Sequence, residues 1–539
     1  MNNLGGFLKK RPRSCSTVIN LILSLYIVVF LNAPFWNRFS SLLGTATAAN
    51  WFLLVLIGIG ILFILNGFFS LLSCKYIFKP SVILILVVAA VVNYYMVSYG
   101  IVISKQMITN LLETDIKESA EQLSLPFFLH VLLKAGIPSA LLILTEIVYQ
   151  PWKKELLERA SVFIGSITIL TLVVFANFKD ITLFGRSHPE LRMYINPTYP
   201  VYSLVKVLAK GSSLTPKEPL KVTAPDATRT PSGHKSLFVL VVGETARAEQ
   251  FSLNGYSRNT NPELASHDIV NFTDVHSCGT DTAESLPCMF SDLGRGNYSR
   301  KEAFKRENLL DILKRTGVNV HWLDNNSGSK GVADRIAGKS FTDAKDPLLC
   351  TAEECFDEVM LQDFDKLITE NSGDMFLVLH QKGSHGPSYY KRSPANFKKY
   401  IPECTQDNVQ DCEKQTIINA YDNTILYTDH FLAKLIDRLK KENYPTAMLY
   451  VSDHGESLGE NNMYLHGMPY SLAPKQQTQV PMIFWGSDSY LKEGNIDKAG
   501  LAKQKNLPYS HDFLFHSILG LFRVKTGSYR QELDIFRST

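Results

Sequence analysis

Long apolar runs fill most of the first 180 residues, and shorter apolar runs alternate with polar stretches after that point. Five of the long runs approach or exceed the roughly 20 residues that a helix needs to cross the hydrocarbon core of a bilayer. They cover residues 17–36, 51–74, 81–99, 126–149 and 160–178. The pattern therefore predicts a transmembrane domain of five helices over residues 1–180.

Lysine and arginine are distributed unevenly around these runs. The N-terminus and the loops after the second and fourth runs hold nine of them, whereas the opposite loops hold three. Because cytoplasmic loops are enriched in these residues, we expect a multi-pass membrane protein with a cytoplasmic N-terminus. An odd number of spans then places the rest of the chain on the far side of the membrane, which in a bacterium is the periplasm.

The loop between the third and fourth runs, KQMITNLLETDIKESAEQLS, is polar but amphipathic. Met107, Ile108 and Leu111 fall at helical spacing, which predicts a helix lying on the outer membrane surface. Its role could be that alone. The alternative is that Asn110 and Glu118 on this loop contact a cationic lipid headgroup.

A second pattern begins after the apolar runs. Prolines recur over residues 181–235 around one helical patch near 201–209, which predicts a bridging helix and an exposed linker. From residue 236 onward the short runs SLFVLVVGE, NVHWLDN, MFLVLH, TAMLYVSDH and VPMIFWG alternate with amphipathic stretches at 307–316, 353–368 and 415–440. This alternation is typical of an α/β domain with a mostly parallel sheet, which we place at residues 236–539.

Charge and cysteine content narrow the functional classes. A net charge of only +4 argues against a nucleic-acid partner. Six of the eight cysteines form close pairs, as disulfides in an oxidising compartment would; the alternative is thiols that are near each other by chance. The pairs are Cys278/Cys288, Cys350/Cys355 and Cys404/Cys412.

Polar side chains follow several of the predicted strands. Carboxyl ends of parallel strands meet at one edge of a sheet, where ligands bind. Carboxylates and imidazoles gathered there suit a zinc ion, although each residue also has a structural reading as a strand cap, loop residue or ion pair. The candidates are Glu244, His385, Asp453, His454 and His466, and His380 ends another of these strands.

The stretch SCGTDTAESLPC would supply a nucleophile to such a site. Its two cysteines bracket a hydroxyl-rich loop, and a helix could begin near Thr282 and present free N–H groups to a phosphate. A threonine hydroxyl attacks poorly unless its proton is removed, which a zinc ion favours. From chemistry alone Thr280, Thr282 and Ser285 are all candidates, and an ordinary disulfide-closed surface loop is the alternative.

Six motifs in order carry a family resemblance. GETARAEQFSLNGY, SCGTDTAESLPCMF, DNNSGSKG, GSHGPSYYKR, AYDNTILYTD and YVSDHGESLGENNMYLHGMP together resemble the lipid A phosphoethanolamine transferases of Gram-negative inner membranes, which include mobile colistin-resistance proteins. The resemblance implies an alkaline phosphatase/sulfatase-like fold and a zinc-dependent monomer. That enzyme would move phosphoethanolamine from phosphatidylethanolamine to lipid A phosphate through a threonine adduct, and so confer polymyxin resistance.

The resemblance also implies residue roles. Thr282 matches the nucleophile, and Glu244, Asp453 and His454 match the residues that join it around one tightly bound zinc ion, with a second ion as an option. Further matches are His385 and His466 for a second metal, phosphate or proton transfer, Asn326 and Lys330 in the donor pocket, and Asn110 and Glu118 at the ethanolamine headgroup.

Other functions were weighed against this one. A sulfatase nucleophile motif would require arginine where Met289 stands. A membrane-anchored phosphoglycerol transferase, or a phosphoethanolamine transferase for another envelope glycan, is the nearest alternative. A non-catalytic membrane scaffold on the same fold is a third, although no nucleophile or ligand position is lost.

Overall fold

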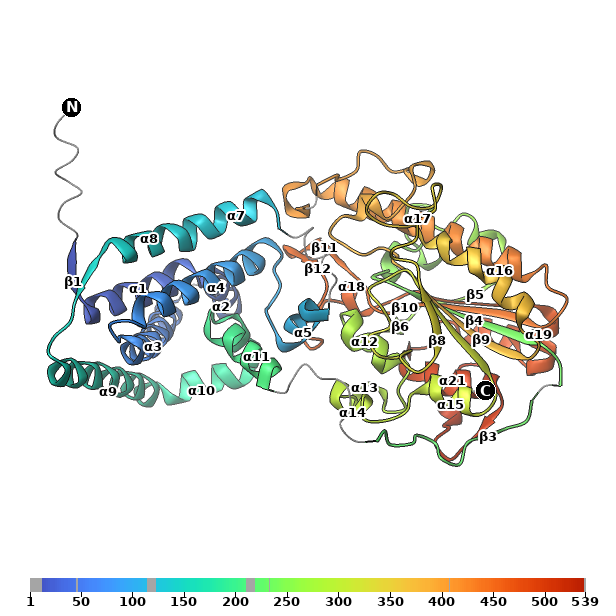
Figure 1. Cartoon of the computed structure of the whole chain (residues 1–539), viewed down its shortest axis with the longest axis horizontal. Helices are drawn as coiled ribbons and strands as arrows, with labels where there is room; N and C mark the ends of the chain where they lie inside the picture. The colour runs from blue at the N-terminus through green and yellow to red at the C-terminus, as the bar shows by residue number, and fades with distance from the viewer. Residues whose placement is uncertain are drawn as a thin grey trace. The chain divides into compact units, whose positions relative to one another are not determined.

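The structure is a computed structural model that describes residues 12–44, 47–113, 123–209, 219–231, 233–406 and 408–537. The chain forms two compact units (Figure 1). The first comprises Met1–Lys105 and Leu123–Lys206, and the second comprises Gln106–Gln122 and Val207–Thr539.

Within the described residues, the first unit has four helices that are long and apolar enough to cross a membrane. Two of them are unbroken helices that overlap the predicted runs at 51–74 and 81–99, namely α3 (Ala48–Leu72) and α4 (Phe78–Ser98). A third consists of α7 (Leu125–Val131), one π-helical turn and α8 (Ile137–Leu144). The fourth is α9 (Trp152–Ala176), which begins before the predicted run at 160–178.

The predicted helix at 17–36 is not one continuous helix. The chain forms α1 (Ser16–Phe30) and α2 (Ala33–Leu43), which meet at a bend of 56°. The buried Asn32 at this break donates through Nδ2 to the backbone oxygens of Ile27 and Asn196, at 2.9 and 2.7 Å, and Pro34 starts α2. Only if the bent pair counts as one span does the total reach the predicted five.

Shorter helices occupy the predicted connecting regions. The amphipathic loop forms α5 (Lys105–Glu113), with Ile108 buried and Leu111 exposed, and residues 114–122, which include Glu118, lie outside the described residues. The bridging region contains α10 (Phe178–Ser187) and α11 (Thr198–Ala209), so the helical patch predicted near 201–209 is part of a longer helix.

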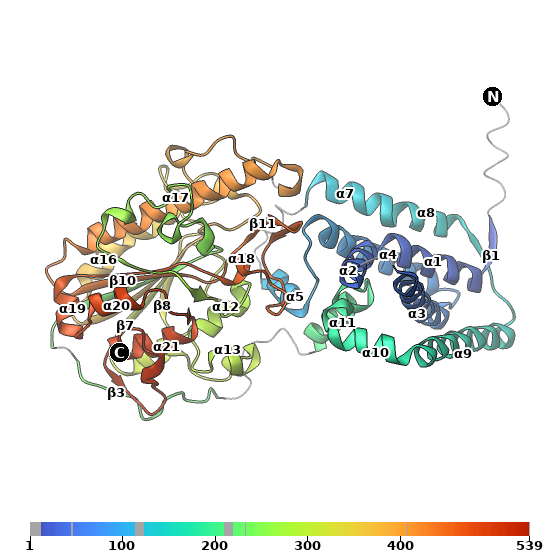
Figure 2. The same ribbon diagram turned by 180° about the vertical axis from the view of Figure 1, so that it is seen from behind.

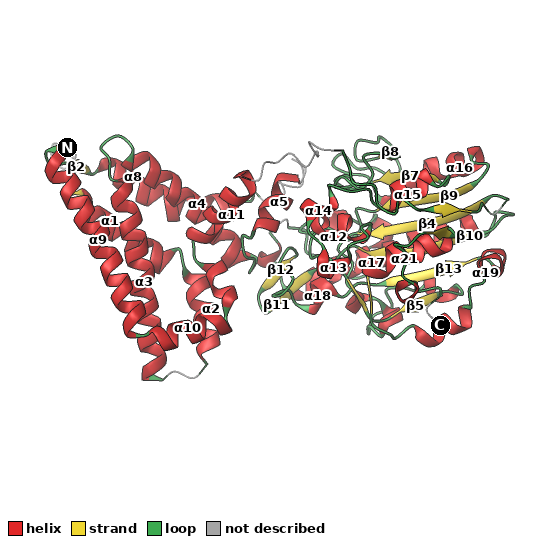
Figure 3. Ribbon diagram, turned by 90° about the horizontal axis from the view of Figure 1, so that it is seen from below, coloured by secondary structure: helices red, strands yellow, loops and turns green. Residues whose placement is uncertain are grey.

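The second unit is built on a seven-stranded sheet, whose strands are yellow in Figure 3. Its order is β5-β13-β10-β4-β9-β7-β8. The strands are β5 (Val270–Phe272), β13 (Met482–Gly486), β10 (Thr446–Ser452), β4 (Ser236–Gly243), β9 (Asp374–His380), β7 (Asn319–Asp324) and β8 (Ala337–Ser340). The run from β10 to β8 is parallel, whereas β13 is antiparallel to both its neighbours. The predicted α/β class with a mostly parallel sheet is confirmed.

Helices cover both faces of this sheet (Figures 1 and 2). This explains why the middles of β4, β9 and β10 are continuously apolar rather than alternating. On one face Phe238 and Leu240 share a core with α15 (Leu309–Arg315) and α21 (Asp512–Leu521). The other face carries α16 (Leu361–Glu370) and α17 (Lys414–Leu439).

Two further sequence expectations meet the structure here. The amphipathic stretch at 353–368 becomes a helix only from Leu361, because the residues before it form a disulfide-closed turn and a 3-10 turn. All three cysteine pairs are joined as disulfides, namely Cys278–Cys288, Cys350–Cys355 and Cys404–Cys412.

Candidate active site

Acidic and imidazole side chains converge at the carboxyl ends of three adjacent parallel strands. Gly243 of β4 is in register with Ser452 of β10, and His380 of β9 is in register with Val242 of β4. Glu244 therefore leaves β4 between Asp453, which follows β10, and His380, which ends β9. All three residues are fully buried.

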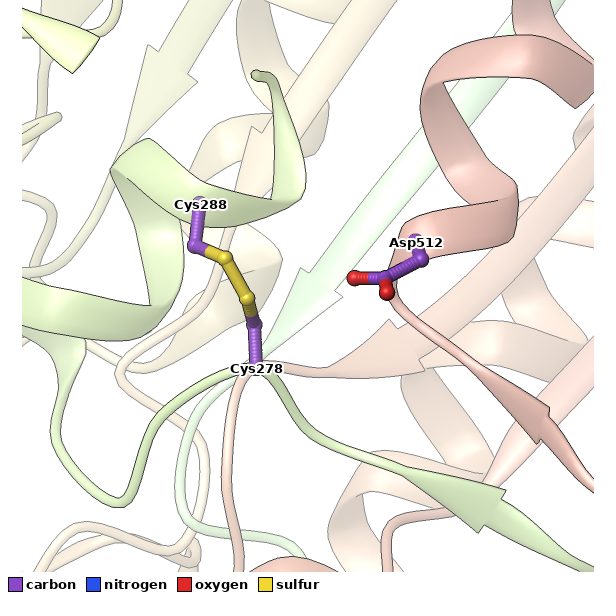
Figure 4. Close-up of side chains that lie close together, drawn as sticks. All are labelled: Cys278, Cys288 and Asp512. Carbon is purple, nitrogen blue, oxygen red and sulfur yellow. A yellow bond between two sulfur atoms is a disulfide. The ribbon is translucent and has the colours of Figure 1, made fainter. Parts of the chain in front are cut away.

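A short helix brings the hydroxyl-rich loop to this edge. Helix α12 (Thr282–Met289) begins at Thr282, and the side chain of Asp281 caps it by accepting from the N–H of Glu284 at 3.0 Å. The disulfide Cys278–Cys288 ties the loop before the helix to its last turn (Figure 4). Gly279 leaves no room for a side chain, since a Cβ there would lie 2.8 Å from the backbone nitrogen of Ser285.

The three candidate hydroxyls have different partners. Thr280 Oγ1 donates to the backbone oxygen of Met468 at 2.6 Å, and Ser285 Oγ donates to the backbone oxygen of Asp453 at 2.5 Å. Thr282 Oγ1 instead lies 3.0 Å from Glu244 Oε2 and 3.4 Å from His454 Nε2. The geometry thus separates Thr282 from the other two, which sequence chemistry left unranked.

Four side chains form a cage of the size that a zinc ion requires. His454 Nε2 lies 3.3 Å from Glu244 Oε1 and 3.4 Å from Asp453 Oδ2. Ligands placed about 2.0–2.2 Å from a tetrahedral centre are about 3.3–3.6 Å apart. Asp453 Oδ2 is buried and has no hydrogen-bond donor among the described residues. His454 Nδ1 lies 2.9 Å from the backbone oxygen of Gly455, which turns Nε2 towards the carboxylates. The residues present therefore fit a divalent metal, with Thr282 as a possible fourth ligand.

The electrostatics of this cage call for a cation. Burial raises the pKa of Asp453, and the charge of Glu244 raises it further. Burial alone would lower the pKa of His454, but Asp453 and Glu244 raise it to about 10. Within the described part of the chain, the ion pairs of both carboxylates are with histidines alone. A bound metal would supply the positive charge that the buried acids lack.

The other two predicted histidines lie beside this cage. The ring of His466 is 4.5 Å from that of His454 and 5.3 Å from that of His385, measured between centroids. Glu456, which the sequence reasoning missed, contacts His466: Glu456 Oε2 lies 3.1 Å from His466 Nδ1. Glu456 lies only two residues after His454, and the second acidic residue in SDHGE was the available signal.

The predicted donor-pocket residues have different positions. Asn326 donates through Nδ2 to Glu244 Oε2 at 2.6 Å and to the backbone oxygen of Gln381 at 2.9 Å, so it orients the carboxylate directly. Lys330 has a left-handed backbone, φ 49°, and its Nζ donates to Ser327 Oγ at 2.7 Å in the same loop.

Sequence reasoning missed a buried pair next to Glu244. His380 Nδ1 lies 2.9 Å from Asp324 Oδ2, and its Nε2 lies 4.0 Å from Glu244 Oε2. Burial alone would raise the pKa of Asp324, but the charge of His380 lowers it. Asp324 ends β7, so the rule of polar residues at strand ends would have found it.

The membrane-surface loop contributes to the second unit. Asn110 lies on α5, and a Cβ on Gly467, next to His466, would lie 3.1 Å from the methyl carbon of Met107 on that helix. Glu118 lies outside the described residues.

One apparent metal cluster has another explanation. Cys278, Cys288 and Asp512 lie close together (Figure 4), but both sulfurs are joined to each other. Disulfide sulfur offers no thiolate to a metal. Asp512 Oδ1 accepts from the backbone N–H of Arg295 at 2.8 Å, which ties the start of α21 to the segment after α12.

Comparison with known proteins places both units. Residues 61–211 match the family "Phosphoethanolamine transferase EptA/EptB", and residues 236–524 match the family "Sulfatase". The phosphatidylethanolamine transferase Mcr-2 from Escherichia coli is 42% identical over 85% of this chain and 86% of its own length.

Solved structures agree with these matches. The integral membrane lipooligosaccharide phosphoethanolamine transferase A (EptA) from Neisseria meningitidis has a TM-score of 0.93 and 35% identity, and the likeness covers 98% of this chain and 99% of that one. The C-terminal periplasmic domain of EptC from Escherichia coli, solved as a complex with Zn, is 22% identical over 59% of this chain and 90% of that one, with a TM-score of 0.51, and so shares the fold. This chain belongs to the EptA/Mcr family of phosphoethanolamine transferases, within the sulfatase and alkaline phosphatase superfamily.

Proposed function

We propose that this protein transfers phosphoethanolamine from phosphatidylethanolamine to a phosphate of lipid A, as a zinc-dependent enzyme with Thr282 as its nucleophile. The observation that carries the proposal is the position of Thr282 Oγ1, 3.0 Å from Glu244 Oε2 in a cage with His454 and Asp453. Family membership supports the transferred group and the acceptor class.

Glu244, Asp453 and His454 would hold the zinc ion, and Thr282 would complete the set. Zinc bound there supplies a Lewis acid that lowers the proton affinity of the Thr282 hydroxyl and offsets charge on the phosphoryl group. Thr282 is held in place by its position at the start of α12 and by the Cys278–Cys288 disulfide. The free N–H groups at the start of that helix would favour the negatively charged phosphoryl group.

Transfer then proceeds in two displacements. Thr282 Oγ1 bonds to the donor phosphorus, the bond from phosphorus to the diacylglycerol oxygen breaks, and that oxygen takes up a proton. A lipid A phosphate oxygen next attacks the phosphoethanolamine on Thr282, and Oγ1 leaves and regains its proton. The family resemblance supports a covalent adduct of this kind, and the buried, positioned hydroxyl supports its location.

Neighbouring side chains have supporting roles in this scheme. His385 and His466 lie close enough to His454 to carry the protons that the two displacements release and consume, or to hold a second metal or the phosphate. Asn326 keeps Glu244 oriented, and Lys330 contributes a positive charge on the donor side. Asn110 and Glu118 would meet the ethanolamine headgroup.

The protein is an integral membrane protein with a periplasmic catalytic domain. We infer that it acts as a monomer in the bacterial inner membrane with its N-terminus in the cytoplasm, which the excess of lysine and arginine in alternate loops supports. Both substrates are lipids, so anchoring the enzyme in the bilayer keeps it with them. Adding an amine to lipid A lowers its negative charge and weakens binding of cationic peptides such as colistin.

Mass spectrometry of lipid A from cells that express the protein tests this function. We expect lipid A to gain phosphoethanolamine in cells with the wild-type protein and not in cells with Thr282→Ala. A phosphoglycerol group on the product, or a modified envelope glycan with unmodified lipid A, would contradict the proposal and favour the corresponding alternative.

A further inference from the structure

A short segment outside the metal cage contacts both loops that reach into it. This segment, residues 350–357, which we name the brace, is closed by the Cys350–Cys355 disulfide and ends at Asp357. On one side lies the DNNSGSKG loop, which carries Asn326. On the other lies the QKGSHGP loop, which carries His385. None of the roles proposed above involves the brace.

Asp357 contacts both loops at once. Its Oδ1 accepts from the backbone N–H of Lys382 at 2.8 Å and from Asn325 Nδ2 at 2.9 Å. Its Oδ2 accepts from the backbone N–H of Gly383 at 3.0 Å. The carboxylate is 3% exposed and thus joins three donors from two loops where water scarcely reaches. Asn325 Nδ2 also donates to the backbone oxygen of Cys355 at 2.9 Å, so the brace holds this side chain twice.

Both loops continue directly to Glu244. Asn326, the residue after Asn325, donates to Glu244 Oε2 at 2.6 Å. Ser384, the residue after Gly383, donates its backbone N–H to the backbone oxygen of Glu244 at 3.0 Å. Gly383 packs so closely that a Cβ there would lie 2.7 Å from that same oxygen. The Asp357 carboxylate therefore holds both loops that contact Glu244, one at its side chain and the other at its backbone.

A second link runs from the brace to His385. Glu354 forms an ion pair with the guanidinium of Arg392, whose side chain is 2% exposed. Arg392 Nε donates to the backbone oxygen of His385 at 2.8 Å. The disulfide closes the turn that presents Glu354 between Cys350 and Cys355. Asp357 thus contacts both loops, whereas Glu354 supports only the loop that carries His385. That loop is therefore held by two acidic side chains of the brace.

We propose that Asp357 is a positioning residue for Glu244 and His385, and that Glu354 supports His385 through Arg392. Neither acid touches the reacting atoms, so each acts by keeping other groups in place. A displacement of about 1 Å in a catalytic group can cost about 100-fold in rate. The inference rests on the proposed function, because it concerns the geometry of that same site.

The test is steady-state kinetics of the full-length protein in phospholipid nanodiscs, with labelled phosphatidylethanolamine as donor, lipid A as acceptor and diacylglycerol release as the signal. We expect Asp357→Ala to lower kcat about 30- to 100-fold, with KM changed less than threefold and zinc content unchanged. Asp357→Asn keeps one acceptor oxygen and is expected to lose only about 3- to 10-fold. Glu354→Gln, which keeps the shape but not the charge, is expected to lose about 2- to 5-fold.

Asp365→Ala is the matched control, because Asp365 on the adjacent helix α16 forms a largely exposed ion pair with Arg438. It is expected to match the wild type. The inference is overturned if Asp357→Ala keeps kcat within threefold of the wild type. It is also overturned if Ala and Asn variants lose activity equally and in proportion to lost zinc or lost folded protein, as a purely structural role predicts.

Should Asp357→Ala fail to fold, the graded losses in Asp357→Asn and Glu354→Gln decide the question. Wild-type rates in both would overturn the inference. A wild-type protein that releases no diacylglycerol would contradict the proposed function itself, whereas an active wild type with an equally active Asp357→Ala contradicts the brace alone.

Discussion

Buried acidic side chains have different charged partners at the two ends of the central sheet. At the amino end, Asp374 begins β9 and pairs with the guanidinium of Arg229, and both side chains are at most 5% exposed. Arg229 Nε also donates to the backbone oxygen of Phe522 at 3.1 Å. At the carboxyl end, Glu244 and Asp453 are buried together, and their ion pairs among the described residues are with histidines alone.

The difference separates a structural acid from a functional one. Asp374 has a permanent positive partner, so its negative charge is balanced by the chain itself. At the carboxyl end the two neighbouring carboxylates have only histidines as ion-pair partners among the described residues, and Asp453 Oδ2 has no hydrogen-bond donor there, so a metal ion would add charge that this end does not supply itself. The burial of an acidic side chain therefore does not by itself indicate a functional role, because the charge of its neighbouring partner must also be known.

Removal of the Thr282 hydroxyl should have the largest effect. Because Thr282 Oγ1 is the atom that bonds to phosphorus in the proposed scheme, Thr282→Ala should lower kcat by at least about 10³-fold. Diacylglycerol release from labelled phosphatidylethanolamine measures this. Thr280→Ala is the matched control, since Thr280 Oγ1 bonds only to a backbone oxygen, and it should retain most activity. Equal losses in both variants would contradict the assignment.

Zinc removal should act at the carboxyl end alone. Chelation is expected to abolish turnover, and added zinc should restore it. Zinc should also raise Tm, because at 100 times its Kd it adds about 2.7 kcal/mol to the unfolding free energy. Asp453→Asn should lose the zinc response. Without zinc it should unfold at a higher temperature than the wild type, because it removes one of two adjacent buried charges. A zinc response of Tm that survives in Asp453→Asn would show that the ion binds elsewhere.

A matched change at the amino end should affect stability but not chemistry. Arg229→Met leaves Asp374 buried without its partner, and breaking such a pair costs about 3–5 kcal/mol of unfolding free energy. The folded fraction should keep the wild-type kcat and zinc content. The double variant Arg229→Met/Asp374→Leu should recover much of the lost stability. If kcat of the folded fraction fell as well, the two ends would not be independent.

A smaller effect concerns the pH dependence of stability. Burial raises the pKa of Asp429 on α17 to about 7 from its ordinary 3.8, although the N–H groups of Glu263 and Leu264 partly oppose this. A raised carboxyl pKa means that the folded state holds a proton that the unfolded state releases. The contribution to stability is therefore present below pH 3.8 and is lost as pH rises through 7.

The measurement is the unfolding free energy of the full-length protein in detergent between pH 5 and 8. We expect it to fall by about 2–3 kcal/mol over this range, and Asp429→Asn should flatten the slope. His430, whose pKa is raised chiefly by its hydrogen bond to Glu358, changes stability in the same direction. A slope that is unchanged in Asp429→Asn would assign the dependence to His430 instead.

Local patterns predicted much of this architecture. Apolar runs without alternation gave β4, β9 and β10, and polar residues at their ends gave Glu244, Asp453 and His454. Polar residues at strand ends identified these three because the carboxyl ends of parallel strands lie at one edge of the sheet, independently of the loop conformations. The same rule would have added Asp324, which ends β7 beside His380.

Contacts between distant segments could not be predicted in this way. The bend after α1 depends on Asn32 bonding to Asn196, 164 residues away, and an apolar run gives no sign of it. Asp357 sits in an amphipathic stretch, and its partners Asn325 and Lys382 come from two other loops. Thr280, Thr282 and Ser285 are chemically alike, so only their partners in the fold distinguish them.

The most direct test of the central claim is the mass of Thr282 during turnover. The full-length protein would be incubated with phosphatidylethanolamine and zinc in the absence of acceptor, quenched, digested and analysed by tandem mass spectrometry. The account predicts phosphoethanolamine on Thr282 and its disappearance once lipid A is added. Phosphoethanolamine on another residue, or turnover with Thr282 unmodified throughout, would contradict it.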